Sequence, residues 1–207
     1  CAATNCEIYS ICIDYIIDHS MLDDISRSTL NHIDEVLFAA ADLGCKIVIF
    51  PLLEESNLDL NSVDQFVEVF RELSVKALKY DLTICVESLM KASDLVAFLE
   101  RVDQDNVKAV FDTGNRVIAR DGNDLHAEIL HLNKFIKHIH IKDKNSEGEN
   151  VILGTGLVDF RSVFSALRDI GYQGPLNFET TRGRDPLKTA AFHMSLCEFF
   201  KSEVREL

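Results

Sequence analysis

The chain has 207 residues, of which 47% are hydrophobic, and its formal net charge at pH 7 is −13. This length allows one sizeable hydrophobic core, so we expect a single domain over residues 1–207. The acidic balance argues against a nucleic-acid partner, because phosphate binding needs clustered Lys and Arg. No apolar run approaches the about 18 residues of a membrane span, so we expect no membrane partner either.

The six cysteines form no C-x-x-C pair and show no spacing typical of metal ligands. Cys12, Cys45 and Cys85 lie in apolar, strand-like segments, where a reduced thiol behaves as a small hydrophobic side chain. The N-terminal residues also lack the basic and apolar regions of a secretory signal. These features predict a cytoplasmic protein with reduced thiols.

Short runs rich in Ile, Val and Phe alternate with segments whose apolar residues follow a helical period. In chain order we predict strand Glu7–Asp14, helix Ser28–Leu43, strand Cys45–Pro51, helix Val63–Tyr80, strand Leu82–Ser88, helix Ser93–Val102, strand Val107–Gly114, helix Leu125–Leu132, strand Phe135–Asp143, helix Asp159–Ile170, strand Leu176–Thr180 and helix Pro186–Val204.

This alternation predicts an α/β fold with a parallel sheet covered by helices. An open doubly wound sheet and a closed TIM (β/α)₈-type barrel both fit the pattern. No Gly-rich turn follows the first strand, and polar residues stand at the C-terminal ends of many strands, which favours the barrel. About six βα units are visible where a barrel needs eight. We therefore expect the barrel to be N-terminally incomplete in this chain.

Four of the predicted strands carry an acidic or imidazole side chain near their C-terminal ends. These residues are Glu87, Asp112, His140 and Glu179. Because the C-terminal ends of parallel strands meet at one rim, the four side chains would converge there. Three carboxylates and one imidazole form a complete ligand set for one divalent cation. The oxygen-rich set favours Mn²⁺ or Mg²⁺, with Co²⁺ or Zn²⁺ also acceptable.

These motifs resemble the xylose isomerase-like TIM-barrel family, in particular its sugar and sugar-phosphate isomerases and epimerases. The resemblance covers nearly the whole chain, with spacings of 25, 28 and 39 positions between the four residues above. The matching stretches are CVES with Glu87, FDTGN with Asp112 and Asn115, HIHIKD with His140, LGTGLVDF over Leu153–Phe160, GYQGPLNFET over Gly171–Thr180, and Arg182. The resemblance implies that the four positions bind one divalent metal and that Glu87 and Glu179 flank the substrate as the catalytic acid/base pair. It also implies two further βα units before the first strand.

The residue types fit a metal-dependent isomerase or epimerase. A metal chelated by a carbonyl and its neighbouring hydroxyl stabilises the enediolate that forms when the α proton is lost. One carboxylate removes this proton and a second returns one, either to the opposite face of the same carbon or to the adjacent carbon. The sequence does not say which glutamate is the base, which sugar reacts, or whether the sugar is phosphorylated.

Four further residues are predicted to contact the substrate. Lys142 lies two positions beyond His140 on the same strand face and would meet an oxyanion or phosphate; the alternative is a solvated strand end. Asn115 would offer its amide to hydroxyls, or else serve as a turn residue. Arg182 follows the last strand, where barrels often bind anions. Asp14, at the end of the first strand, is the fourth.

Two other features have a structural interpretation. We assign His138 to packing under a helix, on the strand face away from His140. The Gly154-Thr155-Gly156 sequence would be either a backbone cradle for a ligand or a flexible loop.

Other functions remain open from sequence alone. A lyase or dehydratase of the inosose or dehydroshikimate type would use the same proton abstraction and then expel a β-hydroxyl. An apurinic endonuclease shares this barrel but is less favoured, because position 115 is Asn and no D-x-H follows His140. A non-catalytic relic is the fourth alternative. We expect a small carbohydrate as the partner, and the sequence leaves a homo-oligomer open.

Overall fold

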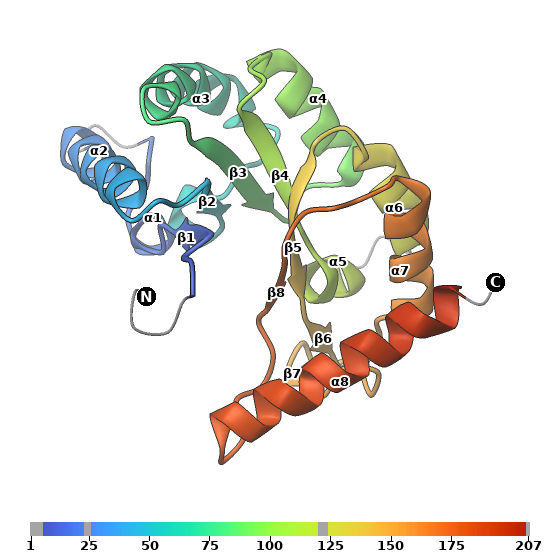
Figure 1. Cartoon of the computed structure of the whole chain (residues 1–207). Helices are drawn as coiled ribbons and strands as arrows, with labels where there is room; N and C mark the ends of the chain where they lie inside the picture. The colour runs from blue at the N-terminus through green and yellow to red at the C-terminus, as the bar shows by residue number, and fades with distance from the viewer. Residues whose placement is uncertain (1–5, 23–25, 120–123, 206–207) are drawn as a thin grey trace. The chain divides into compact units, whose positions relative to one another are not determined.

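The computed structural model of the chain describes residues 6–22, 26–119 and 124–205. Each strand of the six-stranded parallel sheet is followed by one or more helices before the next strand of this sheet begins (Figure 1). The residues form two compact units, Cys1–Val110 and Phe111–Leu207.

The first unit is built on parallel strands in the order β1-β2-β3-β4. The strands are β1 (Ser10–Cys12), β2 (Ile47–Leu52), β3 (Thr83–Ser88) and β4 (Val107–Asp112), whose last two residues begin the second unit. Every residue of β2 is buried, which explains its continuous apolar sequence. The register pairs Ile47 with Thr83 and Ile84 with Val107, so the C-terminal ends of β2 and β3 lie at the same edge.

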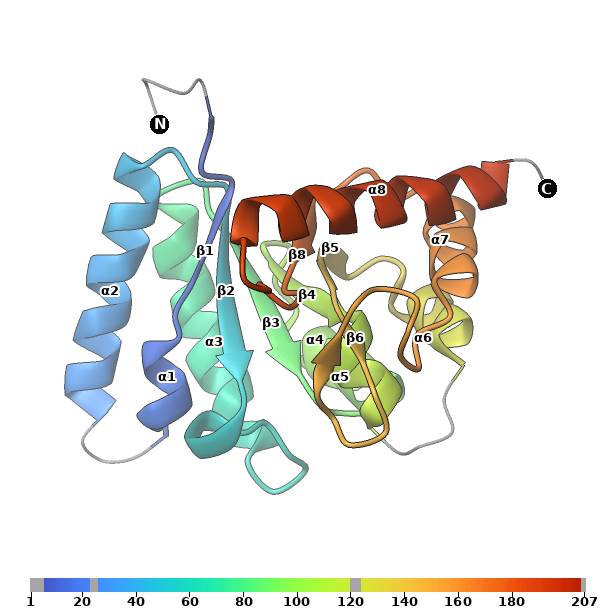
Figure 2. The same ribbon diagram turned by 90° about the horizontal axis from the view of Figure 1, so that it is seen from below.

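Helices follow these strands in the first unit. They are α1 (Tyr15–Asp18), α2 (Ser26–Asp42), the short 3₁₀ helix η1 (Glu54–Ser56), α3 (Val63–Leu78) and α4 (Ala92–Val102). Of these, α3 and α4 each bury an apolar face. Helices α2 and α3 lie side by side (Figure 2). The Phe70 ring of α3 packs edge-on against Phe50 of β2 and Phe98 of α4, with centroids 5.5 and 5.8 Å away. These buried rings tie two helices to the sheet.

The second unit contains the parallel pair β5–β8 and a short antiparallel hairpin. Its elements are α5 (Thr113–Ile118), α6 (Leu125–Leu132), β5 (Ile136–Ile141), β6 (Asp143–Lys144), β7 (Asn150–Val151), α7 (Phe160–Asp169), β8 (Leu176–Phe178) and α8 (Pro186–Arg205). His140 of β5 is paired with Asn177 of β8. The amide of Glu179 donates to the carbonyl of Ile141 at 3.2 Å, which keeps Glu179 beside the end of β5.

A buried ion pair connects α5 to α6. The Arg116 guanidinium donates two hydrogen bonds of 2.7 Å to the Glu128 carboxylate, and both residues are at most 6% exposed. The two-pronged geometry is the strong form of this interaction. It fixes the short helix that follows β4 against the rest of the unit.

All six βα units expected from the sequence are present in the described residues. The short elements were missed: α1, α5 and the β6–β7 hairpin have too few residues to show a period. The predicted strand Val107–Gly114 ends at Asp112, because Thr113 already begins α5.

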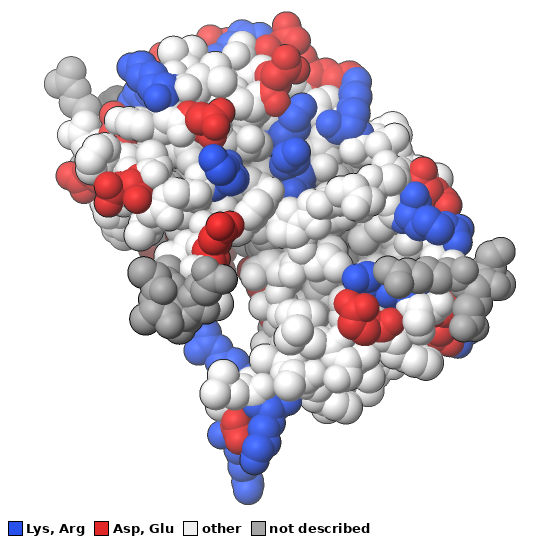
Figure 3. All heavy atoms as spheres, viewed as in Figure 1, with Lys and Arg blue, Asp and Glu red and all other residues white. Residues whose placement is uncertain are grey.

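None of the helices in the described ranges is both long and apolar enough to cross a membrane. On the face drawn in Figure 3, acidic and basic side chains are interspersed, and no broad basic area is visible.

The buried ion pair generates a stability prediction. Glu128→Leu should lower the free energy of unfolding by about 3–5 kcal/mol, because it leaves the Arg116 charge buried without its carboxylate. The double variant with Arg116→Met should recover much of this loss, as measured by urea denaturation. Glu198→Gln, at an exposed ion pair on α8, is the control and should change stability by less than about 0.5 kcal/mol. A Glu128→Leu loss no larger than the control's would contradict this role.

Candidate functional site

Asp112, the last residue of β4, uses its two carboxylate oxygens for different contacts. Asp112 is the N-cap of α5, and its Oδ1 accepts a hydrogen bond of 2.9 Å from the amide of Asn115. Its Oδ2 faces β5 instead, at 3.7 Å from Nδ1 of His140. The residue is buried, so the cap and the neighbouring strand together fix the direction of the second oxygen.

His138 and His140 of β5, and Lys142 directly after it, lie on one face, because alternate residues of an extended segment point the same way. The rings of His138 and His140 are 5.2 Å apart and nearly perpendicular. The assignment of His138 to the opposite face was therefore wrong. Burial, followed by the neighbouring His140, lowers the pKa of His138 to about 4, so this imidazole is neutral at pH 7.

Four side chains of the second unit converge beside the ends of β4, β5 and β8. Nδ1 of His140 lies 3.1 Å from Oε1 of Glu179. The Lys142 ammonium lies 2.6 Å from Oδ2 of Asp112 and 2.7 Å from Oε2 of Glu179. Asp112, His140 and Lys142 are buried, whereas the Glu179 side chain is 37% exposed. We call these four residues the carboxylate cluster.

The charges of the cluster stabilise one another. Burial alone raises the pKa of Asp112, but the His140 imidazole and the positive charge of Lys142 outweigh it and hold this pKa below its usual value. Burial lowers the pKa of Lys142, yet Asp112 and Glu179 together raise it well above the ordinary value. Lys142 is thus an ammonium and Asp112 a carboxylate at neutral pH.

The residues after Asp112 hold Lys142 in place. The Thr113 hydroxyl donates to the Lys142 carbonyl at 2.6 Å and accepts from the Lys142 amide at 2.9 Å. A Cβ on Gly114 would lie 2.8 Å from Cγ of Lys142, so only glycine leaves room for the aliphatic stem. The FDTGN motif therefore supplies both a carboxylate and the support for the lysine.

Asp143 is a structural residue that sequence reasoning missed. It is fully buried, and its carboxylate accepts backbone hydrogen bonds of 2.9–3.0 Å from Lys144, Gly154, Gly156 and Val158. A Cβ on Gly156 would collide with this carboxylate. The amides of the G-T-G sequence thus bind a carboxylate of their own chain. The pairing of an acidic residue with a later G-x-G was the available signal.

The remaining predicted residues are less closely tied to the cluster. Asn115 contributes its backbone amide, and its half-buried side chain stays a predicted substrate contact. Arg182 is exposed and lines, with Glu179 and Thr180, a hollow of about 510 Å³. Glu87 and Asp14 belong to the first unit: Glu87 is buried near the end of β3, and Asp14 is exposed just after β1. Their roles stay predictions.

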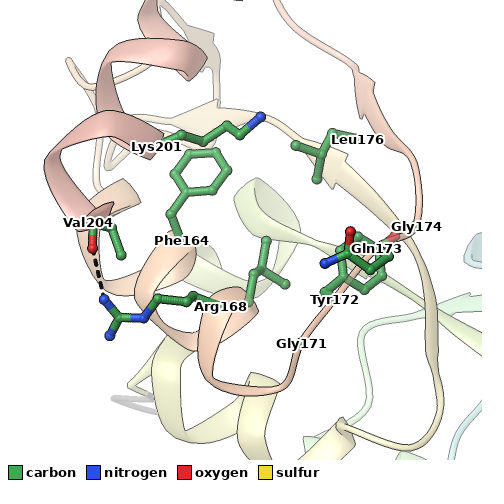
Figure 4. A pocket seen from close by; sticks show the side chains of 10 residues that line it. Phe164, Arg168, Gly171, Tyr172, Gln173, Gly174, Leu176, Lys201 and Val204 are labelled. Atoms are coloured by element: carbon green, nitrogen blue, oxygen red, sulfur yellow. Dashed lines mark hydrogen bonds between the residues drawn. The ribbon is translucent and has the colours of Figure 1, made fainter. Parts of the chain in front are cut away.

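A separate cavity of about 420 Å³ is lined by residues of α7 and α8 and of the segment between α7 and β8 (Figure 4). Phe164 and Tyr172 line it, and Arg168 closes one side by donating to the carbonyl of Val204 at 2.8 Å. It lies by Leu176 at the start of β8, whereas Glu179 follows the end of that strand. This cavity is a packing gap away from the carboxylate cluster.

Comparison with protein families gives the chain its classification. A family model described as xylose isomerase-like TIM barrel matches residues 1–197. The chain therefore belongs to the xylose isomerase-like TIM barrel family, which confirms the resemblance and the barrel-type fold expected from the sequence.

Curated relatives are similar at low identity. "Uncharacterized protein MJ1311" of Methanocaldococcus jannaschii is 23% identical over 201 residues, covering 90% of this chain and 68% of that protein. The ketose 3-epimerase of Arthrobacter globiformis is 35% identical over 85 residues, 41% of this chain and 27% of the epimerase. The inosose dehydratase of Geobacillus thermodenitrificans is 28% identical over 104 residues, 42% of this chain and 34% of the dehydratase. The last two alignments span about a third or less of those enzymes.

Solved structures share the fold. A xylose isomerase domain protein from Planctomyces limnophilus superposes with a TM-score of 0.84 at 21% identity, covering 100% of this chain and 82% of that one. A xylose isomerase-like TIM barrel protein from Mycobacterium smegmatis in complex with magnesium gives 0.78 at 22% identity, covering 98% and 76%.

The Asp143 network generates a second prediction. Asp143→Asn places an NH₂ group where an oxygen accepts backbone N–H groups, so it should lower the free energy of unfolding by at least about 2 kcal/mol. Thermal and urea denaturation measure this loss. Glu147→Gln, exposed in the same hairpin, is the matched control and should be neutral. Equal stability of the two variants would show that the four amides do not depend on Asp143.

Proposed function

We propose that this member of the xylose isomerase-like TIM barrel family is a divalent-metal-dependent sugar or sugar-phosphate isomerase/epimerase. The observation that carries the proposal is the convergence of Asp112, His140 and Glu179, with one imidazole nitrogen 3.1–3.7 Å from an oxygen of each carboxylate. Two carboxylates and an imidazole from three strand ends form a donor set suited to a divalent cation.

Glu87 is the proposed fourth ligand. It is buried and offers a carboxylate oxygen. Its position near the C-terminal end of β3 supports this assignment, because the active sites of such barrels lie at that end of the strands.

The donor set favours Mn²⁺ or Mg²⁺, with Co²⁺ or Zn²⁺ as alternatives. The structural neighbour in complex with magnesium is consistent with an oxygen-rich site in this family. A cation bound there would polarise a substrate carbonyl and stabilise the enediolate left by proton loss.

The residues of the proposed site have two kinds of role: some hold the metal, and others transfer protons to or from the substrate. Asp112 is buried and caps α5, so it acts as a fixed ligand without access to substrate. Glu179 is the exposed carboxylate of the cluster and can reach a C–H bond; Glu87 is proposed to act from the other side of the substrate. His138, neutral and buried, adds no charge beside His140.

The proposed substrate is a small ketose or its phosphate. The epimerase names of several relatives support this class. Asn115, Lys142, Arg182 and Asp14 are the proposed substrate contacts. The hollow that Arg182 and Glu179 line together supports Arg182 as a contact to an anionic end of the substrate. The cytoplasm stays the proposed compartment, and the buried thiols of Cys45 and Cys197 support it.

A dehydratase is the second candidate, because an inosose dehydratase is among the relatives. It would use the same α-proton abstraction and then expel a β-hydroxyl. Accumulation of an enone-type absorbance on incubation with an inosose would select it, whereas an epimerase leaves the number of hydroxyls unchanged.

Proton exchange tests the proposed function. With Mn²⁺ in D₂O, the full protein should incorporate deuterium at carbon next to the carbonyl of a ketose from a broad panel, detected by mass spectrometry and NMR. EDTA should abolish exchange and Mn²⁺ restore it. Glu179→Gln should lower kcat by roughly 10²–10⁴-fold, since it removes the proton acceptor.

Glu198→Gln is the matched control, because it removes an exposed glutamate of α8 and should leave the rate unchanged. Metal-independent exchange, or a Glu179→Gln enzyme as fast as this control, would contradict the assignment.

A further inference from the structure

Lys142 takes a position unusual for a lysine at the end of a strand. Lys142 is only 7% exposed, and its ammonium bridges Asp112 and Glu179 at 2.6 and 2.7 Å. Lys137, within β5, is exposed to solvent, as lysines normally are. The sequence offered a solvated end or a substrate contact for Lys142, and the contacts show a third arrangement.

The bridge is built into the fold. Thr113 holds the Lys142 backbone through two hydrogen bonds, and Gly114 leaves the space that the stem needs. Gly114 lies in α5 with an ordinary helical backbone, where alanine would be the better helix former. The need for glycine at position 114 therefore comes from the nearby Lys142 stem, because the backbone conformation there does not require it.

We infer that Lys142 is an internal cation that occupies the carboxylate cluster until a divalent metal displaces its ammonium from Asp112 and Glu179. The inference rests on the proposed metal site. The ammonium contacts the same two carboxylates that are proposed to bind the metal, so both cations compete for these oxygens. One ammonium balances only one of two carboxylates, and the excess negative charge still attracts the metal.

The exchange has two consequences. Without metal, the ammonium stabilises the buried Asp112 carboxylate and the partly exposed Glu179 carboxylate, which would otherwise repel each other. With metal bound, the stem stays anchored by Thr113 and Gly114, so the released ammonium remains beside the site. There the ammonium is available to bind a substrate oxygen. Lys142 would therefore contact the substrate only after the metal has bound.

Lys142→Met tests the competition directly. Without an ammonium to displace, the variant should bind Mn²⁺ roughly ten- to a hundredfold more tightly than the wild type in calorimetric titration. Its melting temperature should be lower in EDTA, and saturating Mn²⁺ should close most of that gap. Lys137→Met removes the same charge from an exposed position of β5 and should change neither quantity appreciably.

Two measurements do not depend on the stability of Lys142→Met. Gly114→Ala keeps every charge but pushes against the Lys142 stem, so it too should tighten Mn²⁺ binding and lower the melting temperature in EDTA. In wild-type protein labelled with ¹⁵N-lysine, saturating Mg²⁺ should shift the Lys142 ammonium resonance.

The outcomes separate the two proposals. If the wild type binds no Mn²⁺ or Mg²⁺, the proposed metal site and this inference both fail. If the wild type binds metal but Lys142→Met binds it equally or more weakly, or if Mg²⁺ leaves the Lys142 resonance unmoved, only the inference is overturned.

Discussion

The second unit depends on how two neighbouring carboxylates are neutralised at the ends of its strands. Asp112 and Glu179 approach the same imidazole from the ends of β4 and β8, and a cation between them stabilises the buried charge of Asp112 beside the second carboxylate. The Lys142 ammonium, which contacts both carboxylates, supplies that cation. The cap of α5, the glycine beside the lysine stem and the order of side chains on β5 all follow from holding these groups together.

Two short sequence motifs supply most of the residues that form the carboxylate cluster and hold it in place. In FDTGN, Asp112 is a proposed metal ligand and Thr113 hydrogen-bonds to the backbone of Lys142. Gly114 leaves space for the lysine stem, and the backbone amide of Asn115 donates to the capping carboxylate of Asp112. In HIHIKD, His140 and Lys142 enter the cluster, and Asp143 turns away to organise the loop that leads to α7. Substitutions in either motif would therefore affect the charge cluster and the local backbone together.

Strand ends and their chemistry could be predicted from the sequence, because apolar runs mark parallel strands and a polar residue at the end of such a run is conspicuous. Asp112, His140 and Glu179 were found this way and do lie together. The side-chain partners could not be predicted, since they depend on contacts between distant positions. The Arg116–Glu128 pair, the Lys142 bridge and the amide cradle of Asp143 are of this kind. His138 was misplaced by a wrong assignment of strand faces, and the alternation rule would have corrected it.

We propose that the carboxylate cluster is a divalent-metal site that the Lys142 ammonium occupies until a metal binds. A crystal of the full protein soaked in Mn²⁺ and measured for anomalous scattering tests this most directly. We expect one strong anomalous peak bonded to Asp112, His140, Glu179 and Glu87, with the Lys142 ammonium moved off Asp112 and Glu179. A map without a peak at this position, with Lys142 still bridging the two carboxylates, would contradict it.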